Sequence, residues 1–241
     1  ETVNSLFENN TNPSRGSVGT VDKYGSVMTF TGCNFTNNSA EYGGVIYSHQ
    51  ESLAKFTDCK FNGNFGQIGS ISYASDDGRL QMEDCVFEDN FAAEGGLFYF
   101  INAKIEGSII ATNNYVYSPD YLNHAFIVNS SLITVQRSEF VLKGRQTFSN
   151  IKNFVIMEAD SGLTIEDGIF EDLLVNSLLD VSTSRISIRD SHFANIESRV
   201  DKEETAIKAL LNIIQSEVNI TSTLITDISE QFLYVEQCRV V

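Results

Sequence analysis

Three stretches that share one pattern decide the fold of this chain: Cys33-Asn34-Phe35-Thr36-Asn37-Asn38, Cys59-Lys60-Phe61-Asn62-Gly63-Asn64 and Cys85-Val86-Phe87-Glu88-Asp89-Asn90. In each stretch a phenylalanine follows the cysteine by two positions, and an asparagine follows the phenylalanine by three. The stretches begin 26 residues apart. A fixed period of this length is typical of stacked structural units, each too small to bury its own apolar side chains.

The period extends along the whole chain when the phenylalanine is taken as the register position. Its equivalents are Phe7, Phe35, Phe61, Phe87, Ile110, Phe140, Phe170, Phe193 and Ile225. Each of the last eight positions is preceded by two apolar residues, one seven and one five residues earlier. The residue between the two is mostly polar, as in Leu80-Gln81-Met82. Alternation with a period of two predicts a strand that buries one face.

A second strand is predicted in every unit, and it begins with glycine in the first coils, as in Gly43-Gly44-Val45-Ile46-Tyr47. Its expected later copies are residues 125–128, 154–157, 178–181, 210–214 and 232–235. Units of roughly 22 to 32 residues leave no room for a helix or for a four-stranded propeller blade. The sequence therefore predicts an all-β, right-handed parallel β-helix, a pectate-lyase-like (pectin lyase-like) solenoid of about eight to nine coils.

The unbroken register predicts one elongated domain over residues 1–241, with regular coils in 1–110 and degraded repeats with longer loops in 111–241. Insertions at 111–124, 141–153 and 194–209 are expected to leave one corner of the solenoid, and residues 198–210 have a helical composition. Because no initiator methionine or polar cap is evident, we expect a segment of a larger protein. Any membrane anchor would then lie outside this chain.

The formal net charge of −16 argues against nucleic acids and anionic membranes as partners, because no basic patch could neutralise phosphates. Acidic pairs such as Asp76-Asp77 lie near predicted turns, but the EF-hand spacing and the glycine- and aspartate-rich calcium repeat are both missing. The cysteines have neither Cys-x-x-Cys spacing nor an accompanying histidine. We therefore expect no metal site and no cofactor.

The repeated residues predict two structural ladders. The cysteine column of Cys33, Cys59 and Cys85 is expected to continue with small residues at Ser108, Ser138, Gly168, Ser191 and Thr223. It is either a reduced stack or the site of an oxidised pair, because neighbouring rungs bring Cα atoms within disulfide range. The asparagine column is expected to hold Asn10, Asn38, Asn64, Asn90 and Asn113, followed by Lys143, Leu173, Ile196 and Ile228. Stacked amides hydrogen-bond along such a column.

Sequons of the Asn-x-Ser/Thr type occur at Asn9, Asn34, Asn37, Asn129 and Asn219. Asn34 and Asn219 fall on positions predicted to face outward. All five are candidate glycosylation sites, although an Asn-, Ser- and Thr-rich chain produces several sequons by chance.

The pairing of Phe-x-x-Asn at residues 35–38, 61–64 and 87–90 with Gly-Gly-x-Ile-like strands at 43–46 and 95–98 resembles the repeats of chlamydial polymorphic outer membrane proteins. Similar repeats occur in large surface or secreted proteins of protists, including ciliates. The resemblance is specific over residues 7 to about 100. It implies an extracellular or cell-surface β-helix, a glycoprotein used as a stalk, adhesin or matrix component, and it implies no enzymatic activity.

The main alternative is a β-helix that binds or cleaves polysaccharides, which would need clustered carboxylates and a basic partner. The histidines, His49, His124 and His192, lie far apart in register, and the acidic surface would repel polyuronates. No catalytic residue is therefore assigned. We expect a non-enzymatic structural or adhesive protein whose partners are proteins, other copies of the chain or a glycan, contacted through the loops 111–124, 141–153 and 194–209.

Overall fold

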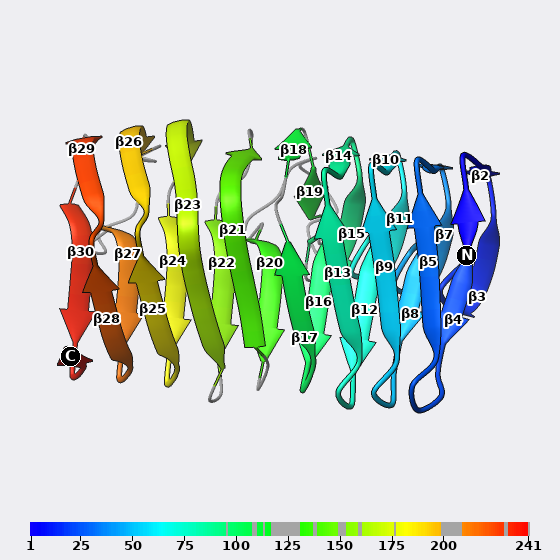
Figure 1. The fold of residues 1–241 in the computed structure, drawn as a ribbon, viewed down its shortest axis with the longest axis horizontal. Coiled ribbons are helices and arrows are strands. Elements are labelled where there is room, and N and C mark those ends of the chain that lie inside the picture. The colour runs from blue at the N-terminus through cyan, green and yellow to red at the C-terminus, as the bar shows by residue number, and fades with distance from the viewer. Residues whose placement is uncertain are drawn as a thin grey trace, which may run out of the picture.

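The protein is described by a computed structural model that covers residues 1–94, 96–107, 110–112, 114–116, 131–136, 139–148, 153–158, 161–175, 177–198, 209–228 and 231–240. These residues form strands and turns that are wound into coils stacked along one long axis (Figure 1). The two termini lie at opposite ends of that axis (Figure 1). Each coil pairs in parallel with the next, as predicted for a parallel β-helix.

The strands belong to three sheets. The nine-stranded sheet contains β4 (Gly19–Val21), β8 (Ile46–Ser48), β12 (Ser72–Ser75), β16 (Phe98–Ile101), β20 (Ser131–Gln136), β22 (Asn153–Glu158), β24 (Ser177–Ser182), β27 (Ala209–Ile214) and β30 (Gln231–Glu236). The five-stranded sheet contains β3 (Thr11–Arg15), β7 (Ser39–Tyr42), β11 (Phe65–Ile68), β15 (Phe91–Glu94) and β19 (Tyr115–Val116).

The 17-stranded sheet covers two sides of the solenoid, because its longest strands continue around the corner between them. Its first side contains β1 (Thr2–Val3), β5 (Val27–Thr31), β9 (Leu53–Thr57), β13 (Arg79–Glu83), β17 (Lys104–Gly107), β21 (Glu139–Phe148), β23 (Gly162–Val175), β25 (Arg185–Arg189), β28 (Glu217–Thr221) and β31 (Arg239–Val240). Its second side adds β2 (Leu6–Glu8), β6 (Asn34–Thr36), β10 (Lys60–Asn62), β14 (Val86–Glu88), β18 (Ile110–Thr112), β26 (His192–Ser198) and β29 (Leu224–Ile228).

A coil in the first half of the chain therefore contains four strands, as in the path β5–β6–β7–β8. The sequence predicted the strands in the positions of β5, β6 and β8, but it missed the one in the position of β7. The inward residues of that strand and its copies are small, namely Ala40, Gly66 and Ala92. Small residues give little apolar alternation, so this strand carries no period-two signal.

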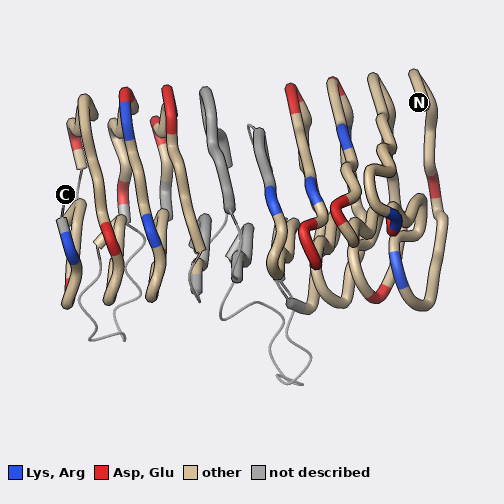
Figure 2. Tube along the Cα trace, turned by 60° about the horizontal axis from the view of Figure 1, so that its bottom comes forward, with Lys and Arg blue, Asp and Glu red and all other residues tan. Residues whose placement is uncertain are grey.

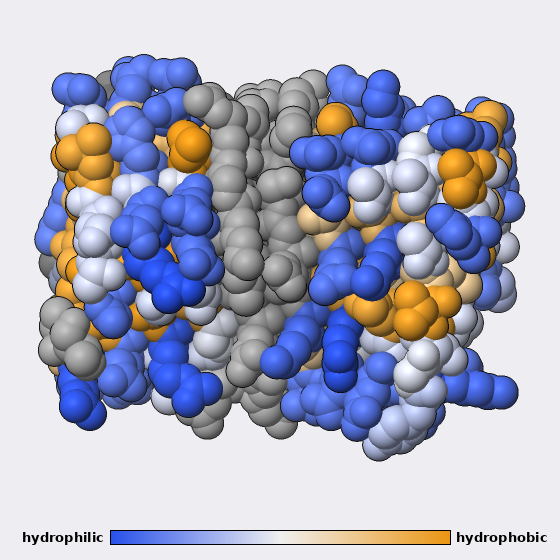
Figure 3. Space-filling model, in the orientation of Figure 1, coloured by the Kyte–Doolittle hydropathy of each residue, from blue (hydrophilic) through white to orange (hydrophobic). Residues whose placement is uncertain are grey.

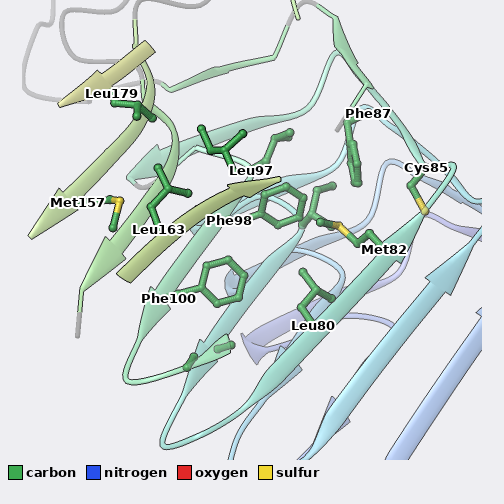
Figure 4. Packing of buried hydrophobic residues seen from close by; sticks show 14 of the residues in the cluster. Leu80, Met82, Cys85, Phe87, Leu97, Phe98, Phe100, Met157, Leu163 and Leu179 are labelled. Carbon is green, nitrogen blue, oxygen red and sulfur yellow. The ribbon is translucent and has the colours of Figure 1, made fainter. Parts of the chain in front are cut away.

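The core lies inside the coils and is built from columns of like residues. Phe35 pairs with Phe61, and Phe61 pairs with Phe87, as the period predicted. Their rings stack with centroids 4.7 and 4.8 Å apart. Figure 4 shows side chains from several strands, including Leu80, Met82 and Phe98, pointing toward one another in this interior. A coil buries its apolar residues only because its neighbours cover them.

Two turns of each coil use left-handed backbone at fixed positions. The first precedes the cysteine column, at Gly32, Asp58 and Asp84, with φ between 51 and 62°. The second follows the register phenylalanine, at Asn37, Gly63 and Asp89, with φ between 52 and 63°. Glycine, asparagine and aspartate tolerate this region best. The asparagine column itself lies one residue further on and does not have left-handed backbone.

The expected register fails in the fifth coil. Phe87 pairs with Ala111, not with Ile110. Ile133 and Val135 pair with Phe98 and Phe100 in the nine-stranded sheet, where residues 125–128 had been expected. Phe140, expected at the register position, consequently lies in the first strand of its coil, where it pairs with Ile105 and Leu163. Lys143, expected in the asparagine column, pairs with Glu166 of the same sheet. The predicted copies at 125–128, Ser108 and Ser138 lie outside the described residues.

From Phe170 onward the predicted register is recovered. Phe170 pairs with Phe193, which pairs with Ile225. Two predicted insertions are corrected, because residues 141–148 belong to β21 and residues 194–198 belong to β26. Residues 198–210 have a helical composition, but Ser198 lies in β26 and residues 209–210 lie in β27. The other residues of this segment lie outside the described residues. The coil count differs slightly from the eight to nine expected, because the described residues supply nine strands to one sheet but only five to the smallest.

Candidate functional site

The asparagine ladder is a closed network of hydrogen bonds. The Nδ2 atom of Asn38 donates to Oδ1 of Asn64 at 2.9 Å, and Asn64 donates in the same way to Asn90 at 2.8 Å. Each amide also donates to a backbone carbonyl of the preceding coil, as Asn64 does to Phe35. The main-chain nitrogen of Asn38 donates to Asn64 Oδ1 as well. These amides are therefore used within the fold, where they link one coil to the next.

The ladder continues to a residue that the sequence did not assign to it. Asn10 Nδ2 donates to Asn38 at 2.8 Å, as predicted. At the other end Asn90 Nδ2 donates to Asn114, not to Asn113, at 2.9 Å. Asn114 replaces the predicted Asn113 for the same reason that Ala111 replaces the predicted Ile110. Both positions come after the same one-residue shift of register. Beyond the shift, Leu173, Ile196 and Ile228 form one column as expected.

The thiols of Cys33, Cys59 and Cys85 are fully buried and free. Each donates a hydrogen bond to the carbonyl two residues earlier, at 3.4, 3.3 and 3.4 Å respectively. The column continues to Gly168 and Ser191, where the Gly168 nitrogen donates to Ser191 Oγ. Cys238 belongs to a different column, in which Ser216 N donates to the Cys238 sulfur at 3.3 Å. The cysteine column thus packs an inner corner with small side chains.

The candidate glycosylation sites differ in exposure. Asn9, Asn34 and Asn37 are exposed, and Asn219 is partly exposed within β28. Asn129 lies outside the described residues. Glycosylation stays a prediction at all five positions.

A stack of tyrosines runs along the outer face of the nine-stranded sheet. Tyr47 of β8, Tyr73 of β12 and Tyr99 of β16 stack with ring centroids 5.5 and 5.6 Å apart. The guanidinium of Arg15 covers the free face of Tyr47 at 4.7 Å, and Tyr42 packs edge-on against Tyr73 at 5.3 Å. The residues at the ends of β3 and β7 therefore cover these rings, so the stack acts as a small apolar cluster outside the main core.

The stack changes the acidity of its central member. Burial raises the pKa of Tyr73 to about 12, and the neighbouring Tyr47, Tyr99, Tyr42 and Asp76 add to the effect. Each of these groups disfavours the charged phenolate. Tyr73 is therefore neutral over the physiological pH range.

Beside this stack the fold brings together four polar side chains from two coils. His49 follows β8, and its Nδ1 atom lies 3.0 Å from Ser75 Oγ at the end of β12. The same nitrogen lies 3.3 Å from Asp76 Oδ2. The Tyr47 hydroxyl lies 3.4 Å from Ser75 Oγ and joins the group. The His49 side chain is 21% exposed and that of Asp76 is 66% exposed, so both can be reached from solvent.

This constellation is not a serine nucleophile triad. In such a triad the serine and the carboxylate hydrogen-bond to different ring nitrogens, because the histidine must accept a proton on one and be oriented through the other. Here Ser75 and Asp76 both approach Nδ1 of His49. The arrangement can hold an imidazole beside a carboxylate and two hydroxyls, which suits recognition of a polar ligand or proton exchange with one.

Sequence reasoning placed His49 in a turn and singled out Asp76-Asp77, but it did not join them. The 26-residue period would have done so, because it places residue 49 beside residue 75 on the next rung. His192 is also paired, with Nδ1 3.0 Å from Glu171 Oε1, on the second side of the 17-stranded sheet. His124 lies outside the described residues.

Elsewhere on the surface, acidic residues gather at several turns of the coils, whereas basic residues also lie along the strands (Figure 2). Arg189 pairs with Glu166 at 2.8 Å, and this hydrogen bond raises the pKa of the guanidinium further. Within the described ranges, no group of three or more His, Cys, Asp or Glu side chains is placed to hold a metal ion. A search of the same ranges found no helix that could span a membrane.

Comparison with known proteins places the chain by its repeat. Residues 1–140 match the family described as right handed beta helix region. No curated protein and no solved structure matches the chain. The family is broader than the chlamydial and protist repeats, and the match does not distinguish among its members. Since the matched region covers more than half of the 241 residues, the chain belongs to the right-handed β-helix family.

Proposed function

We propose that the chain is a non-enzymatic structural or adhesive β-helix that works outside the cell and mediates protein–protein or surface assembly. The observation that carries this proposal is the continuity of the ladders. Asparagine, phenylalanine and cysteine side chains of one coil bond to or pack on their copies in the next. A rod whose stacked asparagine amides satisfy one another from coil to coil resists bending and local opening, which suits a stalk or scaffold.

The surface and the sequence resemblance support the same role. The face seen in Figure 3 is largely hydrophilic over its described part. Among the residues that the structure describes, most exposed large apolar side chains lie near the two ends, as Leu6 and Val27 do near one and Leu224 and Ile225 do near the other. The Phe-x-x-Asn and Gly-Gly-x-Ile repeats resemble those of surface proteins, so we place the chain at the cell surface. Its partners would be proteins or further copies of the chain.

A second candidate is a β-helix that binds or cleaves polysaccharides. One observation favours it, namely the group formed by His49, Ser75, Asp76 and the Tyr47 hydroxyl. This group provides one carboxylate and a basic partner, which suits binding of a polar sugar, whereas cleavage would need a second carboxylate. The second candidate and the scaffold role use different parts of the molecule, and both could operate in one protein.

The scaffold proposal is tested by displaying the chain on beads and measuring bead–bead and bead–cell adhesion. Cleavage of neutral and acidic polysaccharides is measured on the same preparation by the appearance of new reducing ends. We expect adhesion without product formation. Absence of adhesion to beads and cells would overturn the adhesive role, and steady turnover of a polysaccharide would overturn the non-enzymatic one.

A further inference from the structure

The group around His49 differs from a simple surface ion pair. His192 and Glu171 show what such a pair looks like in this fold, with one nitrogen and one carboxylate oxygen 3.0 Å apart on neighbouring rungs. At His49 the ring nitrogen is shared by a hydroxyl at 3.0 Å and a carboxylate at 3.3 Å, and a second hydroxyl lies 3.4 Å from the first. Four hydrogen-bonding groups thus converge where two would suffice to hold adjacent coils.

Backbone hydrogen bonds and ring contacts also fix the positions of His49 and Tyr47. The main-chain nitrogen of His49 donates to Val21 O at 2.9 Å and lies 3.0 Å from the hydroxyl of Ser52, which donates to the same carbonyl. The Tyr47 ring is fixed between Arg15 and Tyr73. Side chains whose positions are set by packing and by further hydrogen bonds can bind a ligand without first being ordered.

The chemistry of the group indicates its ligand. A carboxylate accepts two hydrogen bonds, and hydroxyl and imidazole groups both donate and accept, so together they match adjacent hydroxyls of a sugar. The stacked faces of Tyr47 and Tyr73 are occupied, so recognition would rest on hydrogen bonds and not on stacking of the sugar against a ring. Asp76, exposed Asp77 and nearby Glu51 make the site acidic, which disfavours uronates and other anionic sugars.

We propose that His49, Ser75, Asp76 and the Tyr47 hydroxyl form a binding site for a neutral glycan on the outer face of the nine-stranded sheet. The site is confined to two coils, because the next strand carries Ile101 opposite Ser75. This inference rests on the second candidate function, since it names the ligand class for the same four side chains, and it does not depend on the scaffold role.

The test is a calorimetric titration of the whole chain with neutral hexasaccharides of glucose, xylose and mannose, with an oligogalacturonate as the anionic comparison. We expect at least one neutral hexasaccharide to bind and the oligogalacturonate not to compete with it. His49→Gln and Asp76→Asn should each weaken binding about tenfold, the effect of losing one hydrogen bond to a charged group. The matched control is His192→Gln, which removes the other histidine–carboxylate pair and should leave binding unchanged.

Three results would overturn the proposal. They are failure of every neutral hexasaccharide to bind, equal loss of binding in His192→Gln, and preferential binding of the oligogalacturonate. Thermal melting of each variant shows whether it is folded, and Asp76→Asn keeps a side chain that tolerates the left-handed backbone at this position (φ 47°). Bead adhesion is measured separately, so loss of glycan binding with intact adhesion leaves the scaffold role standing.

Discussion

At the scale of single residues, two serines inside the solenoid stand out because their hydroxyls have no hydrogen-bond partner. Ser70 and Ser72 are both fully buried, and neither Oγ atom is bonded. Ser72 occupies a column in which its neighbours are Ile46 and Phe98. A buried hydroxyl without a partner loses its hydrogen bonds to water and gains none in return. This position therefore costs stability.

Replacing Ser72 with alanine removes the unbonded hydroxyl without adding volume. We expect Ser72→Ala to raise the free energy of unfolding by roughly 1 kcal/mol, measured by urea denaturation. Ser48→Ala is the matched control, because Ser48 is equally buried but lies 3.0 Å from Ser52 Oγ. It should lower the free energy of unfolding by a similar amount. Equal destabilisation by both changes would show that Ser72 is bonded after all.

Tyr73 makes stability depend on pH at the alkaline end. Its pKa in the folded chain is about 12, against an ordinary value of 10.0, so the native state holds the phenolic proton more tightly than the unfolded state. The stability that this provides is complete below about pH 10 and is lost as pH rises toward 12. Tyr73→Phe should therefore reduce the fall in melting temperature over this range. Tyr24→Phe, at a side chain that is 74% exposed, should leave the fall unchanged.

At the scale of structural elements, the turns and ladders between strands connect one coil to the next. The side chain of Asn64 takes part in four hydrogen bonds that link three coils, two as donor and two as acceptor. By contrast, the side chain of Asn10 at the end of the ladder donates one hydrogen bond, to Asn38. A residue in the middle of the column therefore supports two interfaces, and a terminal residue supports one.

This difference predicts a graded loss of stability. Asn64→Ala should lower the free energy of unfolding by roughly 3 kcal/mol, because it leaves several buried partners without bonds. Asn10→Ala should cost clearly less. Asn34 is exposed and lies in the same coil as Asn38, so Asn34→Ala should change the free energy of unfolding by less than about 0.5 kcal/mol. If all three variants unfolded at the same urea concentration, the ladder would contribute nothing measurable.

At the scale of the whole molecule, stability should vary along the rod. Each coil contacts only its neighbours, so the central coils are covered on both sides. Phe61 stacks on Phe35 and on Phe87, whereas Phe7 stacks on Phe35 alone and is only partly buried. The net charge of −16 adds a repulsion that salt screens.

Substitutions at the two phenylalanines should separate these regions. Phe61→Ala should lower the free energy of unfolding by about 3–5 kcal/mol, as expected for a large side chain lost from a packed core. Phe7→Ala should cost less and should increase hydrogen exchange only in the first coils. Mass spectrometry of exchanged peptides measures both effects. Equal acceleration of exchange throughout the chain in Phe7→Ala would mean that the rod unfolds as one unit.

The sequence alone determined the fold class and, in the first coils, three of the four strands and the ladder residues as far as Asn90. It could do so because Phe35, Phe61 and Phe87 recur at one spacing and because strands alternate inward and outward side chains. Stacking like residues on neighbouring rungs is a property of the repeat itself, so it can be read without coordinates.

Only the tertiary structure decided the fifth coil, and it showed which side chains gather at His49, although the 26-residue period already places residue 49 beside residue 75. Around Ile110 the spacing changes, and both Ile133-Thr134-Val135 and Phe140-Val141-Leu142 fit a strand that buries one face. Pairing with Phe98 and Ile105 on the preceding coil selects between them. His49 meets Asp76 for the same reason, because contacts in a solenoid join residues a full coil apart. Local patterns specify each strand, but the stacking of coils determines which side chains become neighbours.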